Sequence, residues 1–105
     1  MTHPSAGLDE AVHQRVRLGV LTITREARRV EFGYLREALG VTAGNLSKHL
    51  SVLTDAGLIV LDKGHEGNRP KTWVRITAAG RKALAREIHN LKLLIQAAET
   101  ESGDA

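Results

Sequence analysis

A cluster of positive charge is the first feature of this chain whose residue types could do chemistry. Between residues 63 and 75 stand the cations Lys63, Arg69, Lys71 and Arg75, against the single anion Glu66. Ammonium and guanidinium groups gathered on a short segment suit contacts with phosphate groups. A solvated basic loop would have the same composition, so the elements that carry these charges must decide between the two interpretations.

A second feature is a predicted helix with two unlike faces over residues 42–56. At about 100° per residue, Leu46, Leu50 and Leu53 share one side of this helix. The opposite side collects small polar groups and one cation, which suits close contact with a polar surface such as the major groove of DNA. The candidate DNA-contacting residues of this helix are Thr42, Gly44, Asn45, Ser47, Lys48 and Ser51.

These residue types have distinct uses against a duplex. Asn45 could bond adenine through both groups of its amide, and Lys48 could reach guanine or a phosphate. Thr42 is expected to cap the helix and could also meet a phosphate at the positive end of the helix dipole. Gly44 would let the backbone approach the partner closely.

The helix lies between two predicted elements that position it. Residues 33–39 predict a two-turn helix that Gly40 ends, and about three residues separate the two helices, which is typical of a helix-turn-helix. After Gly57 the apolar period changes from 3.6 to 2, which indicates β-structure.

The β-structure is predicted to be a hairpin with a basic tip. Residues 58–63 and 72–76 predict its strands, and the intervening residues 64–71 contain two glycines, an asparagine and a proline. His65, Arg69 and Lys71 on this tip are candidate contacts to the DNA backbone or the minor groove. Lys63 and Arg75 are expected to be surface charges of the strands.

Helices are predicted at both ends of the chain. Asp9 is a candidate cap for a first helix that runs to about Thr24, and residues 30–32 could form a very short strand. Thr77 is expected to cap a last helix over residues 78–98. Residues 1–7 and 99–105 are polar and are expected to be disordered.

The last helix carries a heptad seam that suggests a two-fold dimer. Packing of the seam on the first helix within one chain is the alternative, and both arrangements could hold together. In the first helix, Leu18 and Leu21 fall outside the main apolar stripe, which suggests burial on two sides. The predicted dimer interface consists of Leu18, Leu21, Leu84, Ile88, Leu91 and Ile95.

Composition narrows the classes of function. A chain of 105 residues with 15 Lys and Arg against 12 Asp and Glu predicts one domain with a modest net charge of +3. Three aromatic residues are few for a protein that stacks single-stranded bases. The absence of cysteine excludes disulfides and thiolate sites and is consistent with a cytoplasmic protein. We expect no membrane association, because no apolar run reaches about 18 residues.

Metal binding and catalysis find little support in the sequence. Asp9 and His13 are four residues apart, but no third ligand is near them in sequence, and a closed zinc site needs four. We therefore expect no metal and no cofactor. A phosphate-binding glycine loop and a nucleophile-base pattern are also absent, so the sequence predicts a protein that is not an enzyme.

The order of helix, helix-turn-helix, hairpin and long helix is that of a winged helix. Residues 32–42 and 45–58, the hairpin with its Arg69-Pro70 pair, and the exit Thr77-Ala78-Ala79-Gly80 resemble the MarR/ArsR-type winged-helix transcriptional regulators, above all their compact single-domain subgroup. The resemblance spans roughly residues 8–95. It implies a mainly α (α+β) fold, with a winged helix-turn-helix domain over residues 8–98 and a C-terminal dimerisation helix.

The resemblance also implies a function. We expect sequence-specific binding of double-stranded DNA as a homodimeric regulator, with repression as the expected effect. Residues 42–56 would enter the major groove, and the hairpin over residues 63–72 would contact the flanking backbone or minor groove. The alternative is a winged-helix module that docks on another protein without touching DNA. The sequence leaves open the operator and whether a small-molecule effector exists.

Overall fold

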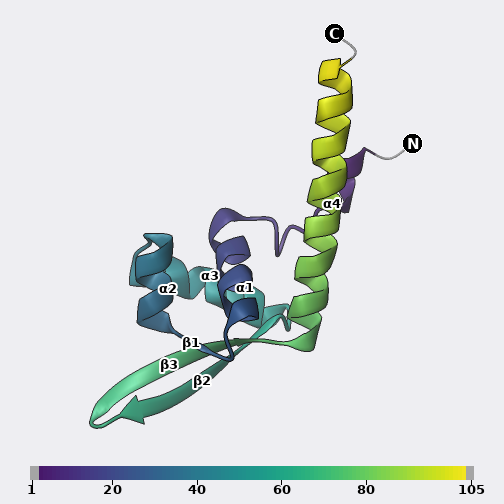
Figure 1. The fold of residues 1–105 in the computed structure, drawn as a ribbon. Coiled ribbons are helices and arrows are strands. Elements are labelled where there is room, and N and C mark those ends of the chain that lie inside the picture. Colours follow the sequence, from purple (N-terminus) through teal and green to yellow (C-terminus); the bar gives the residue numbers. More distant parts are fainter. Residues whose placement is uncertain (1–2, 104–105) are drawn as a thin grey trace.

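The computed structural model describes the backbone of residues 3–103 and the side chains of residues 3–100. In chain order the elements are η1 (Pro4–Gly7), α1 (Arg15–Glu26), β1 (Val30–Glu31), α2 (Phe32–Leu39), α3 (Ala43–Asp55), β2 (Ile59–Glu66), β3 (Arg69–Ile76) and α4 (Ala78–Gly103). Two elements project from the helical body: the β2–β3 hairpin on one side and the far half of α4 on the other (Figure 1). The predicted winged-helix fold is confirmed.

The three strands form one antiparallel sheet in the order β1-β3-β2. Strand β3 is central: Val74 pairs with Val30 on one side and with Leu61 on the other. The predicted short strand at residue 30 thus joins the hairpin as a third strand. Because β1 covers only the base of β3, the tip of the hairpin extends beyond the sheet as a free two-stranded arm.

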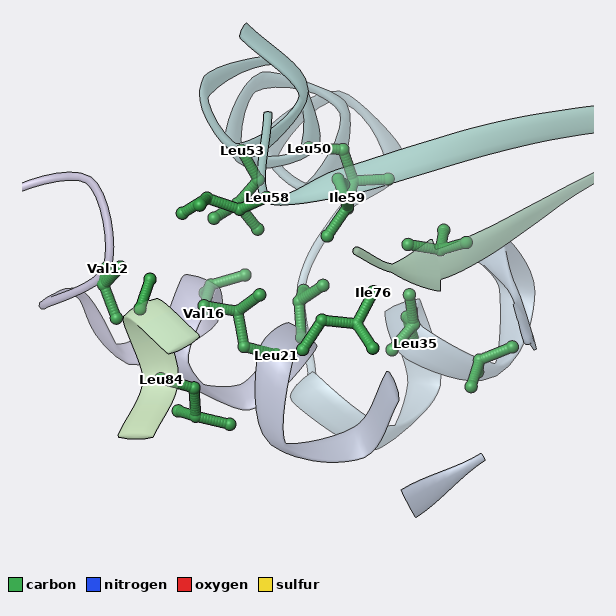
Figure 2. Packing of buried hydrophobic residues seen from close by; sticks show 14 of the residues in the cluster. Val12, Val16, Leu21, Leu35, Leu50, Leu53, Leu58, Ile59, Ile76 and Leu84 are labelled. Atoms are coloured by element: carbon green, nitrogen blue, oxygen red, sulfur yellow. The ribbon is translucent and has the colours of Figure 1, made fainter. Parts of the chain in front are cut away.

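The core lies where α1, α3 and the base of the sheet meet (Figure 2). The inward stripe predicted for the helix over residues 42–56, observed as α3, is present, since Leu46, Leu50 and Leu53 are all buried. The first turns of α4 close the core from the side with Ala83 and Leu84. Burial of apolar side chains from four elements fixes the position of α3 against the sheet, and the direction in which its other face points follows from that.

The N-terminal region differs from its prediction. Residue Gln14, not Asp9, caps α1: its side-chain oxygen accepts hydrogen bonds from the amides of Val16 and Arg17. The residues before it do not fray, because Pro4–Gly7 form a 3₁₀-helix that lies against α4. Residues 4–13, called here the N-terminal strap, therefore belong to the folded body. The predicted disorder of residues 1 and 2 lies outside the described residues.

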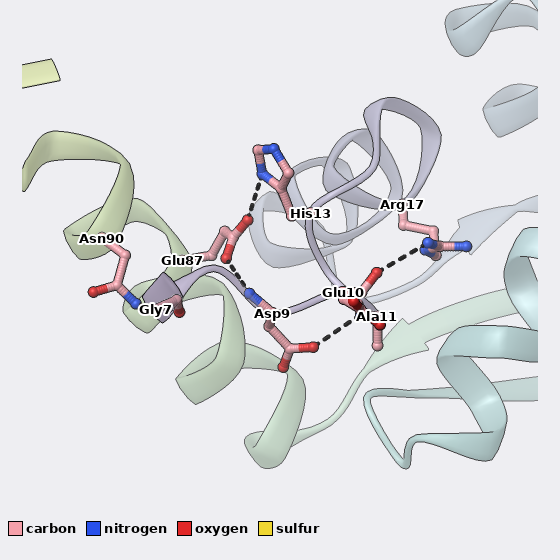
Figure 3. A network of polar contacts seen from close by, with 8 residues as sticks. All are labelled: Gly7, Asp9, Glu10, Ala11, His13, Arg17, Glu87 and Asn90. Carbon is pink, nitrogen blue, oxygen red and sulfur yellow. Dashed lines mark hydrogen bonds and ion pairs between the residues drawn. The ribbon is translucent and has the colours of Figure 1, made fainter. Parts of the chain in front are cut away.

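The strap is held by polar contacts to α4 (Figure 3). The carboxylate of Glu87, which is 1% exposed, accepts a hydrogen bond of 3.0 Å from the amide of Asp9 and lies 2.7 Å from Nδ1 of His13. One turn further along α4, the side-chain amide of Asn90 donates to the carbonyl oxygen of Gly7 over 2.7 Å. A buried carboxylate needs such partners, since burial removes the water that would otherwise solvate it.

The C-terminal region also differs from its prediction. Helix α4 does not end near residue 98 but continues to Gly103, so residues 99–103 are helical and not a disordered tail. Residues 104 and 105 lie outside the described residues. The longer helix contributes to a molecule whose principal extents are 62 × 25 × 22 Å.

Candidate nucleic-acid interface

The turn before α3 is built as the sequence predicts. Gly40 adopts φ 64° at the end of α2, a left-handed conformation that glycine enters without steric cost. Two residues later, the hydroxyl of Thr42 accepts a hydrogen bond of 3.1 Å from the amide of Asn45 and caps α3. Because α2 ends at Gly40 and α3 is capped two residues later by Thr42, the two helices are held in the helix-turn-helix arrangement.

The outward face of α3 is polar and open to solvent. Its large apolar residue is Val52, whose side chain is 38% exposed. Because the leucines of the inner face are buried, the polar residues of the other face cannot turn inward and stay available to a partner. All of the predicted contact residues of this segment are exposed: Thr42, Gly44, Asn45, Ser47, Lys48 and Ser51.

One edge of α3 is tied to α1 by a contact that sequence reasoning missed. A guanidinium nitrogen of Arg17 lies 3.3 Å from Nδ1 of His49, and its other nitrogen donates to the carbonyl oxygen of Glu10 over 3.0 Å. Burial first, and then the charges of Arg17 and Arg15, lower the pKa of His49. The imidazole is therefore neutral near pH 7 and accepts from Arg17. No local sequence pattern signals a contact 32 residues apart.

The hairpin is longer than its prediction. Each strand has eight residues, and Glu66 pairs with Arg69, which leaves Gly67 and Asn68 as a two-residue turn. Gly67 has φ 63°, as the first loop residue of a type II′ hairpin turn requires. The predicted turn segment of residues 64–71 thus consists mostly of strand. His65 and Arg69 are exposed near the tip.

Lys71 is not a free cation of the tip. Its ammonium group forms ion pairs with the carboxylates of Glu31, at the start of α2, and of Glu66 in β2, the latter at 2.8 Å. The hydrogen bonds to Glu31 and then to Glu66 raise the pKa of Lys71, and the bond from Lys71 lowers the pKa of Glu66. The expectation that Lys71 contacts phosphate is therefore revised: this residue anchors the hairpin to the helix-turn-helix.

Arg75 is a surface charge of its strand, as expected. Its guanidinium donates to both oxygens of the Asp62 carboxylate, over 2.6 and 3.3 Å. This bond is the main cause of a lowered pKa for Asp62 and a raised pKa for Arg75. Among the hairpin side chains that the structure describes, Arg69 near the tip and Lys63 in β2 are exposed cations outside any ion pair.

The residues predicted for a dimer interface separate into two groups. Leu21 and Leu84 are 0% and 1% exposed in the core of the single chain, so they cannot contact a second copy and are removed from that prediction. Leu18, Ile88 and Leu91 are partly buried, and Ile95 is 55% exposed on the projecting half of α4. The start of the seam therefore packs within the chain, and its far end, with Ile95, is exposed.

The described residues offer no site for a metal ion. Among them, no group of three or more His, Cys, Asp or Glu side chains comes close enough together to hold one. The backbone amide of Asp9 and the imidazole of His13 instead contact the carboxylate of Glu87. These contacts hold the N-terminal strap against α4. No helix in the described part of the chain is long and apolar enough to cross a membrane.

Comparison with known proteins decides which family these features represent. The family model described as "Winged helix DNA-binding domain" matches residues 16–95, from the start of α1 to the exposed part of α4. The chain belongs to the winged helix DNA-binding domain family. The match covers the helix-turn-helix, the hairpin and most of α4, which are the elements on which the predicted resemblance to winged-helix regulators rests.

Individual relatives agree with this assignment. An uncharacterized protein of Methanocaldococcus jannaschii, MJ0432, is 36% identical over 76 residues, which are 72% of this chain and 83% of the relative. A transcriptional regulator homologue from Pyrococcus horikoshii OT3 superposes with a TM-score of 0.78 at 31% identity, covering 86% of this chain and 89% of that one. The family is one of DNA-binding regulators and not of enzymes.

A more distant structure shares the fold alone. The transcriptional repressor CouR, solved bound to a 23-mer DNA duplex, superposes with a TM-score of 0.76 at 19% identity and covers 93% of this chain and 68% of its own.

Proposed function

We propose that this protein is a homodimeric repressor that binds double-stranded DNA in a sequence-specific manner. Helix α3 enters the major groove, and the hairpin contacts the flanking backbone or minor groove. The observation that carries the proposal is the outward face of α3, where four polar or cationic residues, Asn45, Ser47, Lys48 and Ser51, are exposed. Small side chains allow close approach to base edges, and amide and ammonium groups supply the donors that read them.

Each part of this surface has its own role. Asn45 and Lys48 face outward from the first turns of α3 and are the candidates for base contacts. Arg69 and His65 of the hairpin supply contacts to the DNA backbone, which give affinity and little sequence preference. Lys71 acts indirectly, because its ion pair with Glu31 ties the hairpin to the N-terminal end of α2.

Dimerisation through α4 complements this surface. The far half of α4 projects beyond the body and exposes Ile95, with Leu91 partly buried beside it. A second copy packed along this seam would cover these side chains and place two α3 helices on one duplex, which a palindromic site with half-sites about one helical turn apart would match. The repressor CouR, of the same fold, was solved on a duplex, which supports DNA as the ligand and repression as the effect.

The binding proposal is tested by selecting duplexes from a random pool and measuring affinity for the winner against salt concentration. We expect a palindrome, and a log–log salt slope that falls by about one unit in Arg69→Ala. Lys48→Ala should weaken binding and relax the preference at one or two base pairs. Lys82→Ala, which removes one exposed lysine from α4, is the matched control and should leave both quantities unchanged.

Two results would contradict the proposed DNA binding by α3 and the hairpin. If wild-type protein shifts no duplex at micromolar concentration and low salt, the polar face of α3 serves a protein partner instead, and the protein is a docking module. If it binds but Arg69→Ala and Lys48→Ala behave as Lys82→Ala does, DNA is bound by another surface. Binding of DNA would also agree with the cytoplasmic location expected for the protein.

The dimer is tested separately by analytical ultracentrifugation. We expect a dimer for the wild type and a monomer for Ile95→Arg, because a buried unpaired guanidinium disrupts an apolar seam. Gln96→Arg adds the same group one residue away on an exposed position and is expected to stay dimeric. A monomeric wild type would leave α3 to act alone, and the dimer proposal would be wrong.

A further inference from the structure

A hollow lined by three arginines lies at the base of the hairpin. Arg28 and Arg29, in the connection between α1 and β1, and Arg75, in β3, surround a space of about 410 Å³. None of these residues belongs to the predicted DNA surface. We call this feature the arginine hollow.

The arginine hollow opens on the face of the sheet that is turned away from α3. Side chains of a strand alternate between its two faces. Val74 and Ile76 of β3 are buried in the core with the leucines of α3, so Trp73 and Arg75 lie on the other face. The sheet itself therefore separates the arginine hollow from the helix proposed to read DNA.

Positive charge is concentrated in the arginine hollow. On the outer face of the sheet, Lys71 is paired with two carboxylates and Arg75 with the carboxylate of Asp62. Among the side chains that the structure describes, no carboxylate lies within ion-pair distance of Arg28 or Arg29, although Asp62 is near enough for the charge of Arg29 to help lower its pKa. Guanidinium groups that line one hollow repel each other, and a bound anion would relieve that repulsion.

Two of the three guanidinium groups are held in place before any ligand arrives. The guanidinium of Arg29 stacks over the indole of Trp73, 4.0 Å from the centre of the ring, and both oxygens of Asp62 fix the guanidinium of Arg75. Because Asp62 occupies the fork of Arg75, the forks that can bind the oxygens of a phosphate or carboxylate are those of Arg28 and Arg29. The stacked guanidinium of Arg29 loses little side-chain entropy on binding such a group.

We propose that the arginine hollow binds the oxyanion group, phosphate or carboxylate, of a small molecule. Arg28 and Arg29 supply the charge, Trp73 orients Arg29, and Arg75 completes the lining. The site is separate from the proposed DNA surface, so it can be tested without DNA and does not depend on the proposed function.

Trp73 gives a direct readout, since it is the one tryptophan of the chain. Its fluorescence should change as an anion engages the guanidinium stacked on it. We expect a saturable change on titration with inorganic phosphate or citrate at constant ionic strength, and none with chloride. Whichever of phosphate and citrate binds more tightly identifies the source of the oxyanion. NMR signals of the arginine Nε–H groups provide a second readout that does not need the indole.

Two variants make the test specific. Arg28→Gln should weaken phosphate affinity about ten-fold, because one charge-assisted hydrogen bond is lost. Arg28 is exposed, so the variant is expected to fold, and far-UV circular dichroism checks this. Arg36→Gln removes an exposed arginine from α2 and should bind as the wild type does.

Three results would overturn the inference. One is a fluorescence change that never saturates and follows ionic strength alone. Another is a lack of movement in the arginine Nε–H signals up to tens of millimolar phosphate or citrate. The third is a loss of duplex binding in Arg28→Gln together with competition between phosphate and duplex at constant ionic strength, which would make these arginines part of the DNA surface.

Discussion

The hydroxyl of Thr77 donates a hydrogen bond of 2.7 Å to the carbonyl oxygen of Gly57. The same hydroxyl accepts a hydrogen bond of 2.9 Å from the amide of Gly80 and so caps α4. One side chain thus joins the segment that leaves α3 to the start of the helix proposed to form the dimer.

Replacing Thr77 tests this connection. Thr77→Val keeps the shape of the side chain but loses the cap and the bond to Gly57, and we expect a loss of about 1–2 kcal/mol of unfolding free energy. Urea denaturation measures it. Thr77→Ser keeps the hydroxyl and should lose much less. A larger loss in Thr77→Ser than in Thr77→Val would show that the methyl group, not the hydroxyl, stabilises this corner.

Gly80 allows α4 to approach the chain closely. A Cβ atom at this position would lie 2.1 Å from the carbonyl oxygen of Leu58, and backbone cannot move aside as a flexible side chain can. Gly80→Ala should therefore lower the unfolding free energy by about 1–3 kcal/mol. Gly33→Ala is the matched control, because nothing lies within 4 Å of its added methyl group. A stable Gly80→Ala protein would contradict this packing.

The contact between His13 and Glu87 should stabilise the N-terminal strap. In His13→Ala, the buried carboxylate loses one partner and keeps the amide of Asp9. Relative to the wild type, we expect His13→Ala to lower the unfolding free energy by about 1–2 kcal/mol. We also expect it to speed hydrogen exchange more in residues 4–13 than in the core. His65→Ala, at an exposed position of the hairpin, should change neither measurement. Unchanged exchange in His13→Ala would mean that the strap is held without His13, by the Asp9 amide, Asn90 and apolar contacts.

His49 should make stability depend on pH. Burial, Arg17 and Arg15 lower its pKa in the folded state below the usual 6.5. The unfolded chain then binds more protons between the two pKa values, so the contribution of His49 is complete above pH 6.5 and is lost as the pH falls below it. Urea midpoints between pH 8 and 5.5 should decline more in the wild type than in His49→Gln. Parallel curves would contradict the pKa shift.

Periodicity and turn chemistry in the sequence were sufficient for most of the fold. Leucines spaced along residues 46–53, the capping residue Thr42 and the left-handed Gly40 each act within a few residues, so α2, the turn and α3 can be predicted one after the other. The alternation around Val74 likewise predicts a strand. The order of these elements then leaves few topologies, and a winged helix is one of them.

What a charged or polar side chain does was decided only by the tertiary structure. The sequence predicts Lys71 to be a free cation, but in the fold it forms an ion pair with Glu31, which lies 40 positions earlier in the chain. Glu87, for which nothing is predicted from the sequence, is buried in the fold, and Leu84 is predicted for a dimer seam but lies in the core. Local patterns determine local structure, whereas burial and ion pairing depend on contacts between residues far apart in the chain, which a pattern of neighbours does not contain.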